Sequence, residues 1–175
     1  MVAAPCARFL QFVREPVRSG VRGRPFNRIV RPQVPTYESS MVIAAPVEAV
    51  WPVLTDVVQW PQWLPTVERI EALDQKTLHL GSRFVIHQPK LRPVTWTVSE
   101  IEELRRFAWV ARSPGLHMVA EHSVTPDSPA NTRLVLRFTF AGLLGGIIGR
   151  LFSSLTKSYL AREAASLKQR VESLR

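Results

Sequence analysis

The sequence has few of the residues that close disulfides or bind metals: one cysteine, Cys6, and four histidines in 175 residues. A single cysteine excludes an intramolecular disulfide and a cysteine metal cluster. A reducing cytosol is consistent with this composition, and we expect a cytoplasmic location. The chain also lacks any apolar run of about 18 residues, the length that indicates a membrane-spanning helix, so none is expected.

The histidines do not form a metal-binding pattern. His79, His87, His117 and His122 never stand at i and i+4 on a predicted helix, which is the spacing of paired zinc ligands. A glycine-rich phosphate loop and the nucleophile elbow of hydrolases are also missing. The sequence therefore predicts neither a metal nor another cofactor.

Charge is spread unevenly along the chain. The net charge is +9, and residues 1–36 hold seven arginines against Glu15, a net of +6, which leaves +3 for the other 139 residues. We predict that residues 1–35 form a basic arm without fixed structure and that residues 36–175 form one domain. A hydrophobic content of 46% with five tryptophans is typical of a chain with a packed core.

Four interpretations of the arm are open. It is a leader or the product of an upstream start codon, a basic amphipathic segment that contacts anionic lipid, an organelle transit peptide, or a nucleic-acid-binding segment. The apolar stretch Phe9–Val13 is too short for a secretory signal. Its aromatic residues form no stacking platform, so we expect no specific nucleic-acid partner and keep peripheral membrane contact through residues 1–35 as a hypothesis.

Periodicity in the rest of the chain predicts an α+β domain. Val47, Val50, Trp51 and Leu54 recur at i, i+3, i+4 and i+7, which predicts a short amphipathic helix with Pro46 in its first position. A long helical stretch is predicted at the C-terminal end, over 151–174. The segments predicted as strands are 37–43, 67–73, 81–88, 94–101, 106–111, 116–125 and 132–140. Their short turns predict an antiparallel meander, and the order strand, helix, six strands, helix is α+β.

Alternation along the predicted strands indicates which side chains point inward. In the last strand Arg133 and Arg137 share the face that is expected to meet water. The inward faces of the third, fifth, sixth and last strands are then expected to carry Phe84, Ile86, Gln88, Phe107, Trp109, Ala111, Leu116, Met118, Ala120, His122, Val124, Leu134, Leu136, Phe138 and Phe140. His87 is expected to point outward.

Two tryptophans lie on a proline-stiffened corner after the short helix, Trp60–Pro65, because residues before proline favour extended geometry. This corner belongs to an ordered set of landmarks that resembles the START-like helix-grip superfamily (SRPBCC), in its polyketide cyclase/dehydrase branch. The landmarks are Ala45-Pro46, Glu48, Val50-Trp51, Asp56, Trp60-Pro61, Trp63–Pro65, Gly81–Phe84, Gln88-Pro89, Trp96, Trp109, Pro114-Gly115, His122, Thr132, Gly142, Tyr159-Leu160, Glu163-Ala164 and Leu167-Lys168.

The resemblance runs from about Tyr37 to the C-terminus and is specific for a fold, not for a reaction. It implies the helix-grip fold, a curved antiparallel sheet of about seven strands wrapped around a long C-terminal helix, with one or two short helices after the first strand. Pro52 departs from the pattern, because a proline inside the first helix removes a hydrogen bond and can kink it.

The resemblance also implies an internal cavity between the sheet and the C-terminal helix. Such a cavity would bind a hydrophobic small molecule that is lipid-like, aromatic or polyketide-like. The residues expected to line it are Trp60, Trp63, Phe84, Gln88, Trp96, Trp109, His122, Phe138, Leu155 and Tyr159. The tryptophans among them are equally consistent with an ordinary core, and either a monomer or a homodimer is expected.

Two other functions stay open. The first is a polyketide cyclase, aromatase or dehydratase without metal or nucleotide, for which His122 and Tyr159 are the only nominees as an acid/base pair. Phe138 stands where some relatives carry an acidic residue, which argues against catalysis. The second is a membrane-surface or partner-binding protein that uses the basic arm and the Leu144–Leu155 face.

The C-terminal helical stretch carries an apolar stripe that extends backward into small residues. The stripe consists of Leu160, Ala164, Leu167, Val171 and Leu174. Its extension consists of the small residues Gly145, Gly149, Ser153 and Thr156. The opposite side of the helix carries Leu144, Ile148, Leu151 and Leu155. If the helix is continuous, the small residues leave room beneath it. If the glycines break it, 142–149 is a mobile loop at the cavity mouth. Both alternatives predict that a ligand enters here.

Overall fold

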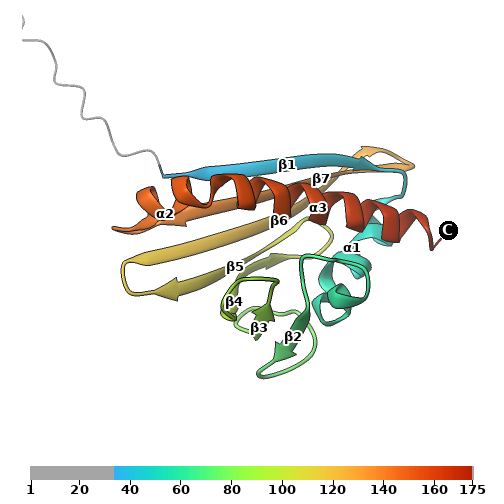
Figure 1. Ribbon diagram of the computed structural model, residues 1–175. Helices are drawn as coiled ribbons and strands as arrows, with labels where there is room; N and C mark the ends of the chain where they lie inside the picture. Colours follow the sequence, from blue (N-terminus) through green and yellow to red (C-terminus); the bar gives the residue numbers. More distant parts are fainter. Residues whose placement is uncertain (1–33, 175) are drawn as a thin grey trace, which may run out of the picture. The chain divides into compact units, whose positions relative to one another are not determined.

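The computed structural model describes residues 34–174, and the predictions for the basic arm fall outside them except at its last two positions. Seven strands form one antiparallel sheet in the order β1-β7-β6-β5-β4-β3-β2 (Figure 1). Their bounds are Thr36–Ile43 (β1), Arg69–Ala72 (β2), Arg83–His87 (β3), Val94–Glu102 (β4), Arg106–Ser113 (β5), Leu116–Ser128 (β6) and Asn131–Ala141 (β7).

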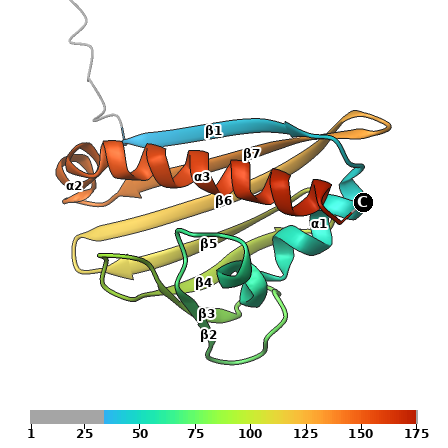
Figure 2. The same ribbon diagram turned by 45° about the vertical axis from the view of Figure 1, so that its right-hand side comes forward.

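Helices α1 (Val47–Thr55) and η1 (Val57–Gln62) follow the first strand, and α2 (Gly145–Leu151) and α3 (Ser153–Glu172) follow the last. α3 lies lengthwise over one face of the sheet and packs on β1 and β7, and its C-terminal part meets α1 (Figure 2). A meander from β2 to β7, closed by β1 and covered by a long helix, is the helix-grip fold. The predicted fold class is confirmed.

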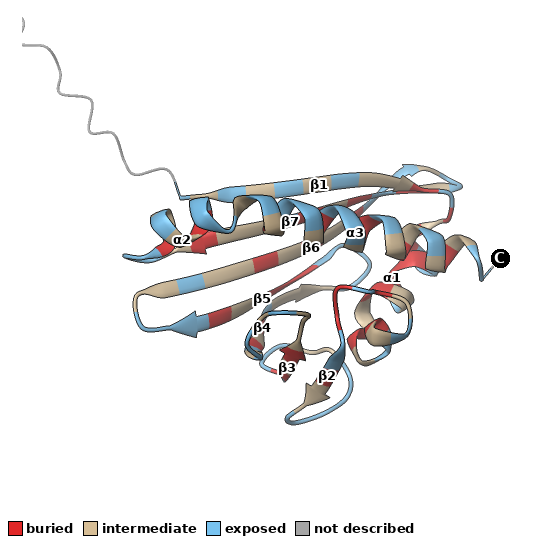
Figure 3. Cartoon of the chain, in the orientation of Figure 1, coloured by how far each residue is buried: buried red, intermediate tan, exposed pale blue. Residues whose placement is uncertain are grey.

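The inward and outward faces of the strands are as predicted. Leu134, Leu136 and Phe140 of β7 are buried, while Arg133 and Arg137 reach solvent and pair with carboxylates. Buried segments follow the strands beneath α3 (Figure 3). The alternation of apolar and polar residues along each strand was sufficient to predict the inward face, because a strand covered on one side must place its apolar residues on that side.

Helix α1 begins one residue later than predicted, because Pro46 is its N-cap and has an extended ψ of 158°. The carbonyl of Pro46 accepts hydrogen bonds from the N–H groups of Ala49 (3.0 Å) and Val50 (3.2 Å). The helix continues through Pro52, which is exposed to solvent, and Asp56 is the C-cap of the helix. Because the proline faces solvent, it leaves the buried face of α1 intact.

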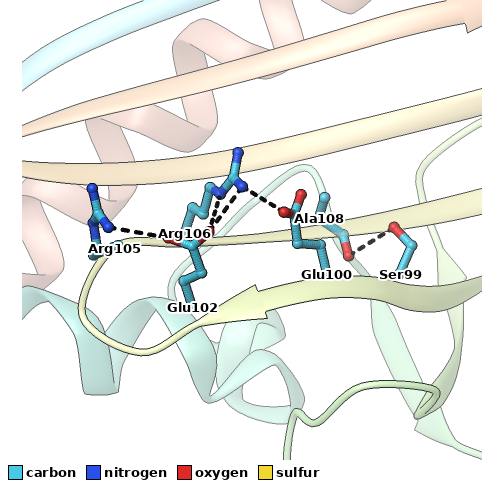
Figure 4. Close-up of polar contacts among 6 residues, drawn as sticks. All are labelled: Ser99, Glu100, Glu102, Arg105, Arg106 and Ala108. Carbon is cyan, nitrogen blue, oxygen red and sulfur yellow. Dashed lines mark hydrogen bonds and ion pairs between the residues drawn. The ribbon is translucent and has the colours of Figure 1, made fainter.

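A bulge bends the sheet between β4 and β5, where the register shifts between Val98 and Glu100. On the outer face Arg106 reaches both Glu100 and Glu102, and Ser99 donates to the carbonyl of Ala108 at 3.3 Å (Figure 4). The hydrogen bond to Glu102, followed by the charges of both glutamates, raises the pKa of Arg106 above its usual range. Bulges increase local bending and twist, so this one adds curvature to the sheet at β4 and β5.

The C-terminal helical region differs from both sequence alternatives. The segment with the glycines is helical from Gly145 onward, and the interruption is a single residue, Phe152. A Cβ on Gly145 would lie 2.7 Å from the carbonyl oxygen of Phe140, and one on Gly149 would lie 2.6 Å from Cβ of Pro35. The glycines therefore leave no empty room, because they let α2 lie directly against the sheet. This contact outweighs a helix penalty of about 1 kcal/mol for each glycine.

Candidate functional site

A cavity of about 340 Å³ lies between the concave face of the sheet and helices α2 and α3. The register aligns Trp109 of β5 with Ala120 of β6, and Ala120 with Phe138 of β7. A small residue therefore stands between two large rings on the same face of the sheet. This arrangement leaves a hollow in the middle of the concave face.

Aromatic rings form the wall of the cavity on the sheet side. The ring centroids of Trp60 and Trp109 are 5.5 Å apart, those of Trp96 and Trp109 are 5.7 Å apart, and those of Trp96 and Phe138 are 5.8 Å apart. The indole N–H of Trp60 donates to the carbonyl of Leu54 at 3.1 Å, which fixes this ring in place. Two of these three pairs are edge-to-face, an arrangement that aromatic rings prefer and that stabilises the wall.

Eight of the ten residues predicted to line the cavity do so: Trp60, Gln88, Trp96, Trp109, His122, Phe138, Leu155 and Tyr159. The other two do not. Phe84 is fully buried and lies behind the wall, with its ring 6.5 Å from that of Trp109. Trp63 packs edge-on against Trp60, with centroids 6.1 Å apart, and is not among the residues that line the cavity. Strand and corner patterns give the inward direction of a side chain but not its depth. A ligand-binding role for the ten residues remains a prediction.

A histidine and a glutamate from distant parts of the chain meet at the cavity. Nε2 of His122, on β6, lies 2.8 Å from Oε1 of Glu163, on α3, and both side chains line the cavity. The His122 side chain is 4% exposed and the Glu163 side chain 16%. The imidazole also stacks on Phe107, with centroids 4.3 Å apart and planes 6° apart. Within residues 34–174, Nδ1 of His122 has no hydrogen-bond partner.

This pair presents one carboxylate oxygen to the cavity. With Glu163 as a carboxylate, Nε2 of His122 carries the hydrogen and donates it, because a carboxylate oxygen only accepts. Oε2 of Glu163 makes no hydrogen bond to any other described residue, so it is left for a donor that enters the cavity. The cavity thus combines mostly apolar walls with a few polar side chains, among them the Glu163 carboxylate that His122 anchors.

Glu163 was not among the predicted site residues. It stands three positions after Leu160 and directly before Ala164, both of which are buried in the inward stripe of α3. Two features of the sequence could have identified Glu163. It lies at the edge of the inward stripe of the C-terminal helix, and this helix faces a strand that carries an inward histidine, His122.

Tyr159 lines the cavity but its hydroxyl is occupied. It donates to the carbonyl of Pro89 at 3.2 Å and so ties α3 to the loop between β3 and β4. In this loop Lys90 has a φ of 64°, which is uncommon for a residue with a side chain. Of the two residues nominated as an acid/base pair, His122 is thus hydrogen-bonded to a carboxylate, whereas Tyr159 is hydrogen-bonded to a backbone carbonyl.

The cavity meets the surface between α2 and the loop after β3. Ile148, Phe152 and Leu155 line it from the helical side, and Leu91 and Arg92 line it from the loop. Phe152 is 38% exposed and Arg92 is also exposed. This opening adjoins the segment where the sequence predicted that a ligand enters.

Neither a metal site nor a membrane-spanning helix was found in the part of the chain that the structure describes. Among residues 34–174, no three His, Cys, Asp or Glu side chains lie close enough together to hold a metal ion. No helix in this range is long and apolar enough to cross a bilayer.

Comparisons with known proteins match this geometry. The model of a family described as polyketide cyclase / dehydrase and lipid transport matches residues 35–172. No match was found among curated proteins. One similar solved structure is the Zhui aromatase/cyclase from Streptomyces sp. R1128, with 20% identity, a TM-score of 0.66, and coverage of 80% of this chain and 94% of that chain.

Two further structures show the same fold. A START superfamily protein from Mycobacterium smegmatis is 17% identical, with a TM-score of 0.62 and coverage of 80% of this chain and 99% of that chain. Norcoclaurine synthase from Thalictrum flavum, in complex with dopamine and hydroxybenzaldehyde, is 13% identical, with a TM-score of 0.67 and coverage of 91% and 99%.

Proposed function

Because the chain belongs to the polyketide cyclase/dehydrase and lipid transport family, we propose that it binds a hydrophobic, ring-containing small molecule in the cavity between sheet and α3. A hydroxyl or another donor group of this molecule hydrogen-bonds to Glu163. The observation that carries the proposal is a mostly apolar hollow in which the Glu163 carboxylate is anchored by His122, the composition typical of small-molecule sites.

The size of the cavity narrows the ligand class. A volume of about 340 Å³ is near the lower end of the range for small-molecule pockets, about 300–1,000 Å³. This suits a molecule of a few rings and excludes a two-chain phospholipid held whole inside. The solved norcoclaurine synthase complex contains dopamine and hydroxybenzaldehyde, which are molecules of this size with ring hydroxyls.

The anchor can be tested with naphthalene and 2-naphthol, which differ by one hydroxyl. We expect the full-length chain to bind both, as measured by quenching of tryptophan fluorescence, and to bind 2-naphthol more tightly. Glu163→Gln keeps the shape of the side chain but removes its charge. It should weaken 2-naphthol binding about tenfold or more, because a hydrogen bond to a charged group is worth about 1.5–3 kcal/mol, and leave naphthalene binding unchanged.

Glu48→Gln is the matched control, because Glu48 is an exposed glutamate on α1 away from the cavity. It should bind both compounds like the unaltered chain. Equal loss of both compounds in Glu163→Gln would contradict the anchor, and no binding of either compound by the unaltered chain would contradict the proposal itself.

A second candidate function is favoured by the His122–Glu163 pair. A carboxylate in an apolar cavity, hydrogen-bonded to an imidazole, can take a proton from a carbon between two carbonyls of a poly-β-ketone. The carbon of the resulting enolate bonds to a third carbonyl carbon, which closes the ring, and the carbonyl oxygen takes up a proton to become a hydroxyl. Loss of this hydroxyl and a neighbouring hydrogen as water then forms a double bond in the ring. Acceleration of this cyclisation over buffer, abolished in Glu163→Gln, would support it, and no acceleration would exclude it. The cytoplasmic location and the oligomeric state remain predictions.

A further inference from the structure

Half of the exposed large apolar side chains among the described residues are gathered at one end of the molecule. They lie within ten residues around α2: Leu143 is 93% exposed, Leu144 44%, Ile147 69%, Leu151 76% and Phe152 38%. We call these five residues the α2 surface. Single exposed apolar residues are ordinary, but a contiguous group indicates an interaction site.

The periodicity of α2 places this surface beside the cavity. Gly145 and Gly149 face the sheet, and Ile148 and Phe152 line the cavity. Ile147 and Leu151, four positions apart on the remaining face, point to solvent. Phe152 belongs to both groups, so the α2 surface is continuous with the mouth of the cavity.

The segments around the α2 surface carry positive charge only. Residues 88–93, 112–117 and 143–157 contain Lys90, Arg92, Arg112, Arg150 and Lys157, and no aspartate or glutamate. All five are exposed, and none is in an ion pair with a described residue. Arg112 follows the inward Ala111 and so points to the other face of the sheet, which leaves four cations on the side of α2.

These segments are held near one another by hydrogen bonds. The N–H of Leu144 donates to the carbonyl of Gly115 at 2.9 Å, which joins α2 to the turn between β5 and β6. The Tyr159 hydroxyl joins α3 to the loop after β3. Figures 1 and 2 show the β5–β6 turn at the same end of the sheet as α2.

We propose that the α2 surface binds to a lipid bilayer that contains anionic lipid, with α2 lying in the plane of the interface. Aliphatic and phenylalanine side chains surrounded by Lys and Arg are the composition of interfacial helices, and each basic group near an anionic surface adds to the attraction. A second copy of the chain fits less well, because a two-fold contact would bring four cations against four cations.

Binding in this orientation has a consequence for the ligand, which rests on the proposed function. Phe152 would face the bilayer, and a hydrophobic molecule could pass between lipid and cavity without crossing water. The bilayer contact depends only on the exposed apolar side chains of the α2 surface and the basic residues around it, so it can be tested separately from ligand binding.

Flotation of vesicles with the full-length chain tests the contact. We expect binding to vesicles of phosphatidylcholine with phosphatidylglycerol, and weaker binding to phosphatidylcholine alone. Ile147→Ser with Leu151→Ser should lower the affinity for the anionic vesicles at least about tenfold, because each side chain loses its apolar burial. The matched control is Leu73→Ser with Leu80→Ser, which removes two exposed leucines elsewhere (46% and 66% exposed) and should bind like the unaltered chain.

A labelled cysteine provides a second measurement that does not depend on the double variant folding. In a Cys6→Ser background, an environment-sensitive fluorophore at Ile147→Cys should shift to the blue on anionic vesicles, and one at Leu80→Cys should not. The proposal is overturned if the α2 double variant floats like the unaltered chain, which would assign binding to the basic arm. It is also overturned if neither label shifts, or if sedimentation shows that the double variant has lost a dimer rather than lipid affinity. Loss of vesicle binding with 2-naphthol binding intact would leave the ligand proposal standing.

Discussion

The side chain of His122 is packed on several sides, and this fixes the position of the Glu163 carboxylate to which it is hydrogen-bonded. Its ring stacks on Phe107, lies 5.7 Å from the ring of Trp109 and 5.6 Å from that of Trp60, and reaches Glu163 through Nε2. A side chain packed on all sides has one rotamer, so it fixes the direction of its partner as well. In the proposed function, His122 would therefore act on a ligand through Glu163, as a positioning residue.

Replacement of His122 tests this account at the scale of one residue. His122→Leu has a similar volume but removes the donor to Glu163, so a mostly buried carboxylate loses its partner. We expect the free energy of unfolding, measured with urea, to fall by about 1–3 kcal/mol.

The double variant His122→Leu with Glu163→Leu provides the control. It removes both polar groups, and replacing a buried polar pair by apolar residues is often close to neutral. Recovery of most of the lost stability would support the pairing, whereas additive losses would contradict it.

At this scale the sequence predicted the histidine but not its partner. The alternation of β6 placed His122 inward, because every second residue of that strand is apolar or small. Glu163 lies beside an apolar stripe and not within it, and such a position is solvated on most helices. Only the distance between α3 and β6, a tertiary property, shows that its carboxylate reaches the imidazole.

At the scale of the element, α2 is defined by glycines that allow contact with the sheet. Gly149→Ala would place a Cβ 2.6 Å from Pro35 and 3.1 Å from Phe140. We expect a loss of about 1–3 kcal/mol in the free energy of unfolding, as for overpacked cores, measured by thermal or urea denaturation.

Gly146 is the matched control for Gly149, since it lies in the same helix with only the end of the Arg150 side chain nearby. Gly146→Ala should stabilise the chain by about 0.5–1 kcal/mol through helix propensity alone. If both variants shift stability in the same direction by the same amount, the close packing of α2 is not what its glycines provide.

Helix α3 can be used to close the cavity. Leu155 lines it, whereas Leu151, one turn earlier, is 76% exposed on the solvent side. Leu155→Trp should place an indole in the hollow and lower the affinity for 2-naphthol at least about tenfold, with little change in stability, because the space for the ring is already empty.

Leu151→Trp carries the same substitution on the other face and should leave 2-naphthol binding unchanged. The comparison is read by fluorescence titration, with circular dichroism to verify folding. Equal effects of the two substitutions would contradict the assignment of the Leu155 face to the cavity.

The elements themselves were largely predictable, and their interruptions were not. Seven strands and the C-terminal helix follow from periods of 2 and 3.6 in the hydrophobic pattern. The helix Gly145–Leu151 lies close to Phe140 and Pro35 through Gly145 and Gly149, and local propensity does not contain such contacts.

At the scale of the whole described domain, the hollow results from how the sheet curves away from its helix. α3 packs on β1, β7 and α1, and the rings on β4 and β5 reach the cavity from the opposite side. The sequence indicated which faces would enclose this space, but not its volume, because volume depends on the depth at which rings such as Phe84 come to rest. The α2 surface lies at the open end of the same hollow.

The most direct test of this account is a crystal structure of the full-length chain grown with 2-naphthol. We predict density for the naphthalene rings between Phe138 and Leu155, with the hydroxyl within hydrogen-bonding distance of Oε2 of Glu163. Side chains that fill this space and exclude the compound, or density for it only on the outer surface, would contradict the central claim that the domain encloses a binding cavity.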